Sequence, residues 1–261
     1  MSPPVRSETE ELERAEVRVL GTRLHAVDRA QALAWVDAWI QAGTRAHIAT
    51  VNPEFVMRAR RDHAFHALLN RTRLNLPDGI GILLAAGLRR AALPERVTGV
   101  ELVHDISKLA ARRGSRLLLV GGAPGIAAGA ARELASTNPG LPLPDAHVGS
   151  PDPDGDDEAQ RVLAEVAPQV VFVAYGAPAQ EFWIERNISP TMGVVALGVG
   201  GALDYVSGKV PRAPLALRAL GLEWAFRLWR QPSRWRRMRV LPAFAFLAAR
   251  EALGADERGK P

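Results

Sequence analysis

The chain has 261 residues, of which 48% are hydrophobic and 23% charged, and this balance excludes an intrinsically disordered protein. It contains no cysteine, which excludes disulfide frameworks, thiolate zinc sites and a cysteine nucleophile, and which suits the cytosol. The net charge of +5 is unevenly distributed, because residues 209–239 hold nine basic side chains and one acid while residues 1–208 are mildly acidic.

The two ends of the chain show no secretory or membrane-spanning pattern. Residues 1–15 are polar and acidic, lack the apolar core of a signal peptide, and are expected to form a flexible arm. The longest uncharged run near the other end, residues 240–249, has ten residues, whereas a bilayer span needs roughly 20. We therefore expect no transmembrane segment.

From residue 16 onward, apolar periodicity predicts strands that alternate with helices. Strands are expected at 16–27 (a short pair), 46–52, 72–76, 115–122, 169–176 and 193–201. Helices are expected at 28–43, 53–70, 79–88, 99–114, 123–140, 156–168 and 177–187. Short apolar strands between helices are typical of a mostly parallel sheet with helices on both faces, so the predicted class is α/β. We expect a catalytic domain over 16–207 and a basic helical appendage over 208–261.

In open parallel sheets, ligands bind beyond the carboxyl ends of the strands. The segments expected there are 50–52, 77–79, 121–122, 175–178 and 198–201. Glycine recurs at these ends, which allows a backbone to approach a phosphate, and we expect Gly122, Tyr175 and Gly176 to border the bound ligand. Asp78 supports two interpretations, because an Asp between a strand and a helix is a favoured N-cap and also a candidate catalytic base.

Several motifs that would indicate other chemistry are missing or incomplete. The Gly-rich segment 198–201 does not continue as a dinucleotide fingerprint, because Leu203 occupies the third glycine position. No P-loop and no nucleophile elbow occur, and the acidic stretch 152–158 fits a solvated loop better than a metal site. His63 and His66 lack a nearby carboxylate at useful spacing and are interpreted as surface or groove residues.

The basic segment 209–239 contains Trp224, Trp229 and Trp235 among its arginines and precedes the apolar run 240–249. A solvated charged helix is one interpretation, and a nucleic-acid-binding tail is another. Arg and Trp on short amphipathic pieces are also typical of a segment in a membrane interface, where each basic residue contributes about 1 kcal/mol near anionic lipid. The acidic body and the apolar end favour lipid over nucleic acid.

Six motifs together resemble the WecG/TagA/CpsF glycosyltransferases over about residues 17–239. They are TVNPEFV, PDGIGIL, RVTGVEL, LLLVGGAPG, YGAPAQEFWI and the long segment GVGGALDYVSGKVPRAPLALRALGLEWAFRLWRQPSR. The resemblance implies a Rossmann-like α/β domain with a basic appendage, and an inverting enzyme that needs no metal or other cofactor. Such enzymes transfer N-acetylmannosamine, its uronic acid or glucose from a UDP-sugar to a polyprenyl-diphosphate-linked sugar in cell-surface polysaccharide synthesis.

The resemblance also implies roles for individual residues. Asp78 matches the proposed general base, and Arg96 matches the arginine that meets the diphosphate. The other matched donor-site residues are Thr50, Asn52, Gln180 and Asp204, and the arginines expected to face the acceptor and an anionic membrane surface are Arg212, Arg227, Arg230, Arg234 and Arg237. The implied location is the cytoplasmic face of the plasma membrane, with the protein peripheral to it and compatible with a homo-oligomer.

Four positions depart from the family pattern. Glu101 stands where Asp is usual and Ala179 where Lys is frequent, and both lie near the expected pocket, so they bear on the identity of the donor sugar. Leu203 and Gln231 replace a common Phe and Glu. The alternative is a non-catalytic nucleotide- or nucleic-acid-binding module that uses the Arg/Trp tail, and a nucleotide-dependent oxidoreductase is a weaker third option.

Overall fold

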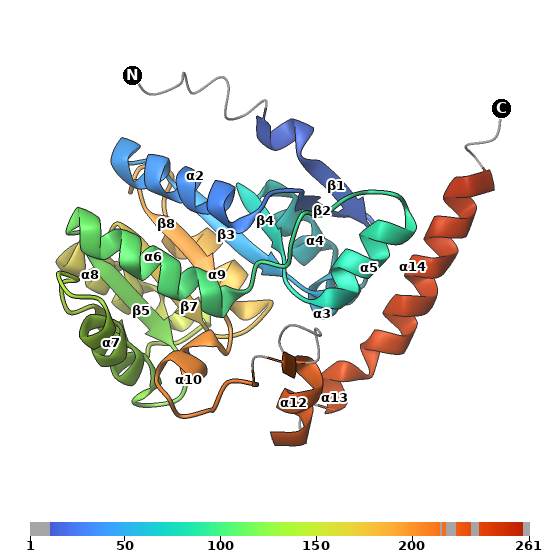
Figure 1. Cartoon of the computed structure of the whole chain (residues 1–261). Helices are drawn as coiled ribbons and strands as arrows, with labels where there is room; N and C mark the ends of the chain where they lie inside the picture. Colours follow the sequence, from blue (N-terminus) through green and yellow to red (C-terminus); the bar gives the residue numbers. More distant parts are fainter. Residues whose placement is uncertain (1–10, 215, 218–222, 231–234, 258–261) are drawn as a thin grey trace.

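The computed structural model describes residues 11–214, 216–217, 223–230 and 235–257, and its centre is a six-stranded sheet (Figure 1). The strand order is β4-β3-β8-β7-β5-β6, and every neighbouring pair is parallel. The strands are β3 (Ala46–Val51), β4 (Leu74–Pro77), β5 (Leu117–Gly121), β6 (Asp145–His147), β7 (Val170–Ala174) and β8 (Val195–Gly198). A separate antiparallel pair is formed by β1 (Glu16–Val19) and β2 (Thr22–His25). The predicted α/β class is confirmed.

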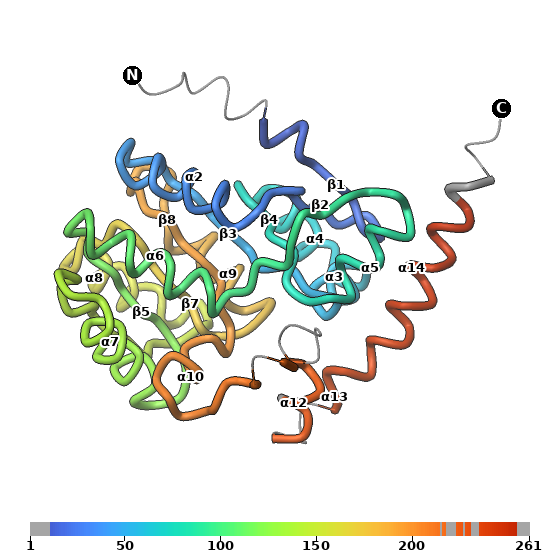
Figure 2. The backbone as a smooth tube through the Cα atoms, in the orientation of Figure 1, coloured from blue at the N-terminus to red at the C-terminus, as the bar shows by residue number. Residues whose placement is uncertain are grey.

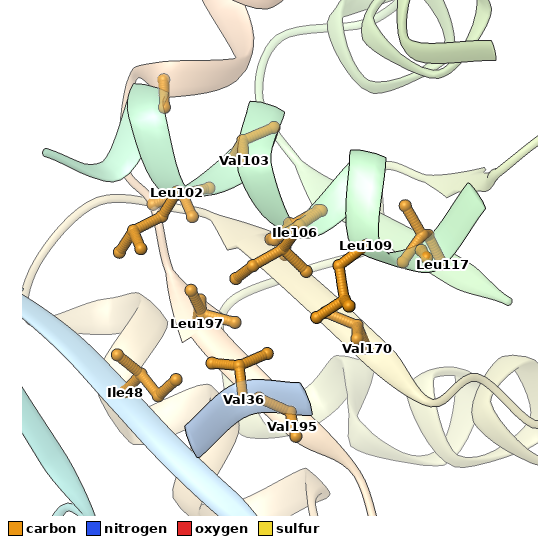
Figure 3. Close-up of a cluster of buried hydrophobic side chains, with 14 of the residues drawn as sticks. Val36, Ile48, Leu102, Val103, Ile106, Leu109, Leu117, Val170, Val195 and Leu197 are labelled. Carbon is orange, nitrogen blue, oxygen red and sulfur yellow. The ribbon is translucent and has the colours of Figure 1, made fainter. Parts of the chain in front are cut away.

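Helices cover both faces of the sheet. They are α2 (Arg29–Ala42), α3 (Pro53–Ala59), α4 (His63–Arg71), α5 (Ile80–Leu88), α6 (Gly99–Arg113), α7 (Ile126–Thr137), α8 (Asp156–Val166), α9 (Ala179–Asn187) and α10 (Ala202–Val206). Beyond them follow α12 (Glu223–Arg230), α13 (Trp235–Met238) and α14 (Val240–Glu257). Successive side chains of a strand point to opposite faces of the sheet, so the strands contribute to a hydrophobic core on each face. In β5, Leu117 and Leu119 face α6 and α7, while Leu118 and Val120 face α8 and α9. Figure 3 shows the first core, in which Val36, Ile106 and Leu197 meet.

Three regions differ from what the sequence predicted. The single helix expected over 53–70 is divided into α3 and α4, because the Asp62 side chain accepts a hydrogen bond from the Phe65 amide (3.0 Å) and starts a new helix. Strand β6 was not predicted, since its three residues are largely exposed and carry no apolar pattern. Residues 11–14, assigned to the flexible arm, form a helical turn whose Leu12 is buried in the core, and residues 1–10 lie outside the described residues.

Helix α5 departs from expectation at its start. Its N-cap is Gly79, with a φ of 103°, so the expectation that Asp78 is the N-cap residue is wrong. Its buried face consists of Ile82, Ala85 and Ala86. The larger side chains of Leu84 and Leu88 point outward, since they are 62% and 57% exposed.

The carboxyl-terminal helix α14 runs along the flank of the body beside α3 and α5 (Figure 1 and Figure 2). Phe244 and Ala248 are buried in the same cluster as Phe55 and Ile82. Further along, Glu251 accepts a hydrogen bond from the Leu20 amide (3.1 Å) and pairs with Arg89 (3.4 Å), which ties α14 to the β1–β2 turn and to the end of α5. No helix in the described part of the chain is long and apolar enough to cross a bilayer.

Candidate active site

Asn52 and Asp78 lie side by side because they follow adjacent parallel strands. Val51 of β3 is opposite Pro77 of β4, and the Asp78 amide donates to the Val51 carbonyl (2.8 Å). The Asn52 side chain accepts from the Phe55 amide (3.1 Å) and caps α3. Each residue is therefore held at the carboxyl edge of the sheet, where ligands bind in open α/β folds.

The strand ends border a cavity of about 640 Å³, here called the strand-end cavity. Its floor contains Thr50, Asn52, Asp78, Gly176, Gln180 and the segment 199–201. Its outer wall carries four arginines, Arg58, Arg61, Arg236 and Arg237, together with Glu54, Asp62 and His63. Backbone amides at glycine-containing strand ends beside several guanidinium groups suit an anionic ligand such as a diphosphate.

A second cavity of about 460 Å³ lies between α5 and α14 and is here called the α5–α14 groove. Its walls are mostly apolar and include Ile80, Leu84, Leu88, Trp224, Leu241, Phe244, Ala245 and Ala248. Asn52, Glu54 and Asp78 border this groove as well as the strand-end cavity. Asp78 therefore stands where two spaces of different chemistry meet.

Gln180 is fixed by a buried network under the strand-end cavity. Its Oε1 accepts from the amides of Gly176 (3.0 Å) and Gly200 (2.9 Å), which links the ends of β7 and β8. Its Nε2 donates to Glu181 Oε1 (2.8 Å), and the other Glu181 oxygen lies 2.5 Å from His47 Nε2. The side chains of His47 and Glu181 are 3% and 0% exposed. A β-carbon at position 198 would collide with the Glu181 carboxylate, so the network requires Gly198.

A second charged network joins the body to the basic segment. Glu223 of α12 lies 3.5 Å from Arg96 and 3.8 Å from Arg212, and Arg212 also meets Glu101 (3.3 Å). Burial raises the pKa of Glu101, but hydrogen bonds from Thr98 and the charge of Arg212 outweigh burial, and the net pKa is lowered. Glu101 is thus an anion that holds Arg212 in place.

The structure brings together six of the fourteen predicted site residues. Thr50, Asn52, Asp78, Gly176, Gln180 and Arg237 all line the strand-end cavity. Arg96 lines the α5–α14 groove instead, close to Asp78, because the Val97 amide bonds the Pro77 carbonyl (2.9 Å).

Other predicted residues lie elsewhere. Gly122, Tyr175 and Asp204 fall outside the described lining of both cavities. The Tyr175 hydroxyl donates to the Val148 carbonyl (2.7 Å), and burial raises its pKa. In the appendage, Arg237 pairs with Glu54 (3.8 Å) and Arg230 lies over Trp229, while Arg234 and the side chain of Arg227 lie outside the described residues.

Some site residues were not predicted from the sequence. Arg58 and Asp62 follow Glu54 at intervals of four residues on the segment that starts at the end of β3, and this spacing places them toward one wall. This spacing could have predicted that the three residues share one wall of the site. Glu181 follows the predicted Gln180 but was not itself predicted, and nothing in the sequence pairs it with His47. In the described part of the chain, no group of three His, Asp or Glu residues could hold a metal ion.

Comparisons with known proteins agree on one family. Residues 17–258 match the profile described as "Glycosyl transferase WecG/TagA/CpsF family". The chain is 32% identical over 210 residues to an N-acetylglucosaminyldiphosphoundecaprenol N-acetyl-beta-D-mannosaminyltransferase of Bacillus subtilis (strain 168), covering 79% of this chain and 80% of the relative. Identity to the protein of the same name from Bacillus spizizenii is 34% over 204 residues, covering 76% and 77%. The corresponding protein of Staphylococcus aureus (strain MW2) is 29% identical over 210 residues, covering 80% and 82%.

Proposed function

The chain belongs to the WecG/TagA/CpsF family of glycosyltransferases, and we propose that it moves a hexose from a UDP-sugar to a sugar carried on a polyprenyl diphosphate. The names of the relatives give N-acetylmannosamine as the transferred sugar and N-acetylglucosaminyl-diphosphoundecaprenol as the acceptor, and we propose the same pair here. The uronic acid of N-acetylmannosamine and glucose are the other candidate donors. The product would enter a cell-surface polysaccharide.

One observation carries this proposal: Asp78 borders both the strand-end cavity and the α5–α14 groove. A glycosyltransferase base must contact an acceptor hydroxyl while the donor anomeric carbon lies within reach of that hydroxyl. A carboxylate shared by a polar cavity and an apolar groove meets this requirement for a polar donor and a lipid-linked acceptor. We assign the strand-end cavity to the UDP-sugar and the groove side to the acceptor.

In the proposed step, the Asp78 carboxylate accepts the proton of the acceptor hydroxyl. The acceptor oxygen forms a bond to the anomeric carbon of the donor, and the bond between that carbon and the UDP oxygen breaks. Attack from the face opposite the leaving group inverts the configuration. General base catalysis of this kind contributes about 10²- to 10⁴-fold to a rate.

The departing UDP carries negative charge that must be balanced. We propose that arginines provide this balance without a metal ion, since Arg58, Arg61 and Arg237 line the strand-end cavity and Arg96 lies on the other side of Asp78. Fixed guanidinium groups stabilise charge that develops in a transition state and cost no reorganisation. Their planar donors also match phosphate oxygens well.

We propose that residues 208–261 form an appendage that holds the enzyme at the anionic inner face of the plasma membrane. Trp229 is 73% exposed, and Trp224 and Trp235 are also exposed. These rings lie among basic side chains of α12 and α13, a combination that favours the interface of a bilayer. Nucleic acid is not a proposed partner.

The test is transfer of labelled sugar from UDP-N-acetylmannosamine, its uronic acid and UDP-glucose to N-acetylglucosaminyl- and glucosyl-diphospho-lipids, with and without EDTA. We expect transfer from one donor, unchanged by EDTA, with an inverted linkage in the product. Loss of activity in EDTA that Mg²⁺ restores would overturn metal independence. Absence of transfer with every pair would overturn the assigned substrates.

A further inference from the structure

Helix α5 exposes its large apolar side chains and buries its small ones. Leu84 and Leu88 are mostly exposed, whereas Ala85 and Ala86 face the core with Ile82. A helix that only packs on a domain turns its large apolar residues inward, and a contiguous exposed apolar surface marks a binding site. We therefore expect a ligand to cover the exposed leucines of α5.

These leucines form one wall of the α5–α14 groove. The opposite wall is α14, where Ala245 is exposed toward the groove and Phe244 closes its base. Gly81 permits this arrangement, because a β-carbon there would lie 3.0 Å from Pro53 and 3.7 Å from the Phe244 ring. Small residues on both helices thus keep open a channel with apolar walls.

The groove changes character along its length. Asp78 and Arg96 both lie near the start of α5. A hydrogen bond from the Val97 amide to the Pro77 carbonyl holds Arg96 there. Leu84 and Leu88 lie roughly 6 and 12 Å further along the helix from Ile80, given the rise of an α-helix. The groove thus combines charged groups, namely Glu54, Asp78 and the Arg96–Glu223 pair, with an apolar surface along α5.

We propose that the α5–α14 groove binds the first isoprene units of the acceptor's polyprenyl chain, an inference that rests on the proposed function. A sugar diphosphate carried on a polyprenol combines a polar head, which bears the reacting hydroxyl, with a branched hydrocarbon. With the reacting hydroxyl at Asp78, the hydrocarbon enters the apolar part of the groove beside Leu84. The enzyme then recognises the lipid directly, apart from any contact with the bilayer.

The experiment uses soluble acceptors in the absence of membranes or micelles. N-acetylglucosaminyl diphosphates are prepared with a methyl group, with a few isoprene units, or with a saturated linear chain of equal carbon number. For the full-length wild type, we expect KM to fall by about tenfold or more from the methyl to the isoprenoid acceptor, because apolar area is buried. The linear chain should gain less than the branched one.

Two matched variants locate the effect. Ala245→Trp fills the groove and should abolish the gain from the isoprenoid chain, so that the ratio of KM for the methyl acceptor to KM for the isoprenoid acceptor falls to about one. Ala243→Trp is the control, because Ala243 is exposed on α14 but lies on another face of the helix, outside the described lining of the groove. It should keep the full gain. Circular dichroism and the melting temperature confirm that both variants fold.

The outcomes separate this inference from the proposed function. Transfer to the methyl acceptor tests the function alone. Equal KM values for all chain lengths, or equal effects of the two variants, would overturn the groove assignment while leaving the function intact. If no acceptor reacts, calorimetric binding of a short prenyl diphosphate to the wild type and to both variants still tests the groove. A change in oligomeric state on Ala245→Trp, with unchanged chain-length dependence, would assign the groove to a second copy of the chain.

Discussion

The strand-end cavity and the α5–α14 groove meet at Asp78, yet their walls differ in origin and chemistry. The floor of the strand-end cavity is built mainly from residues at the ends of β3, β4, β7 and β8, and the Gln180 side chain joins two of these ends by hydrogen bonds. The groove is built from two helix faces that are distant in the sequence, and its walls are mostly apolar. In the proposed reaction, this difference lets one carboxylate serve a water-soluble donor and a lipid-linked acceptor.

The largest expected effect concerns the residue that both spaces share. Asp78→Asn should lower the turnover number by about 10²- to 10⁴-fold, because the amide cannot accept the acceptor proton. Binding of UDP in the strand-end cavity should persist in calorimetry, since the variant removes a base and leaves the cavity walls in place.

Asp62→Asn is the matched control for Asp78→Asn. Asp62 lines the strand-end cavity and caps α4, and Asn caps a helix as well as Asp does. We expect a much smaller loss of turnover. Equal losses in the two variants would show that cavity charge, and not a base at position 78, governs the rate.

The next effect concerns the buried network under the strand-end cavity. Glu181→Leu leaves His47 and Gln180 without their buried partner and should lower the free energy of unfolding by about 3 kcal/mol. Glu181→Gln can retain both hydrogen bonds and should lower stability less, while raising KM for the donor more than KM for the acceptor. Urea unfolding and steady-state kinetics measure the two results. If only the KM for the acceptor rose, the buried network would not support donor binding, and this prediction would be wrong.

Acid should weaken the scaffold under both spaces alike. Burial, aided by the charge of Arg23, lowers the pKa of His25 to about 4, and its Nδ1 accepts from the Asn75 amide (2.9 Å), which requires the neutral ring. Because the unfolded chain takes up this proton near pH 6.5, stability is intact above that pH and is lost as the pH falls toward 4, by about 3 kcal/mol in total.

Denaturation at pH 7.5, 6, 5 and 4 measures the acid effect, and His25→Gln should reduce its slope. The same slope in both proteins would assign acid sensitivity to other groups. Above pH 6.5, any change of activity with pH then belongs to the cavities and not to unfolding of this site.

The smallest expected effect concerns membrane contact beyond the groove. Replacing Trp229 and Trp235 by Ser should weaken co-sedimentation with anionic liposomes by about 5- to 10-fold, because two exposed rings leave the interface. KM for a soluble isoprenoid acceptor should change little. Leu143→Ser, at an exposed apolar position on the body, is the control. Salt-sensitive binding to duplex DNA that the double variant abolishes would favour the nucleic-acid interpretation of this segment instead.

The sequence predicted much of the strand-end cavity because parallel strands align their ends. Asn52 and Asp78 each follow an apolar run, and in a parallel sheet such residues meet at one edge. The orientation of α5 was not predictable in the same way. Its residues are apolar on both sides, so periodicity identified a helix but could not show which face is covered by the core.

Contacts between segments that are distant in the chain could not be predicted from the sequence either. The pairing of Arg96 with Glu223 and of His47 with Glu181 joins residues more than a hundred positions apart, and no local pattern encodes such a pair. The role of Asp78 as the N-cap residue of α5 was predicted from a strong local preference. It was wrong because the chain extends to Gly79 before α5 begins.

Gly198 touches neither cavity wall, yet the space left by its absent side chain is where the Gln180 amide and the Glu181 carboxylate pack. In a saturation mutagenesis experiment, even alanine at this position should abolish activity. The loss of activity would be as large as at a residue that binds substrate. Anyone who engineers the donor preference of this enzyme by directed evolution should therefore keep position 198 fixed. Diversity is better introduced on the outer wall at His63, whose side chain borders the cavity without supporting its floor and is not one of the arginines assigned to the departing UDP.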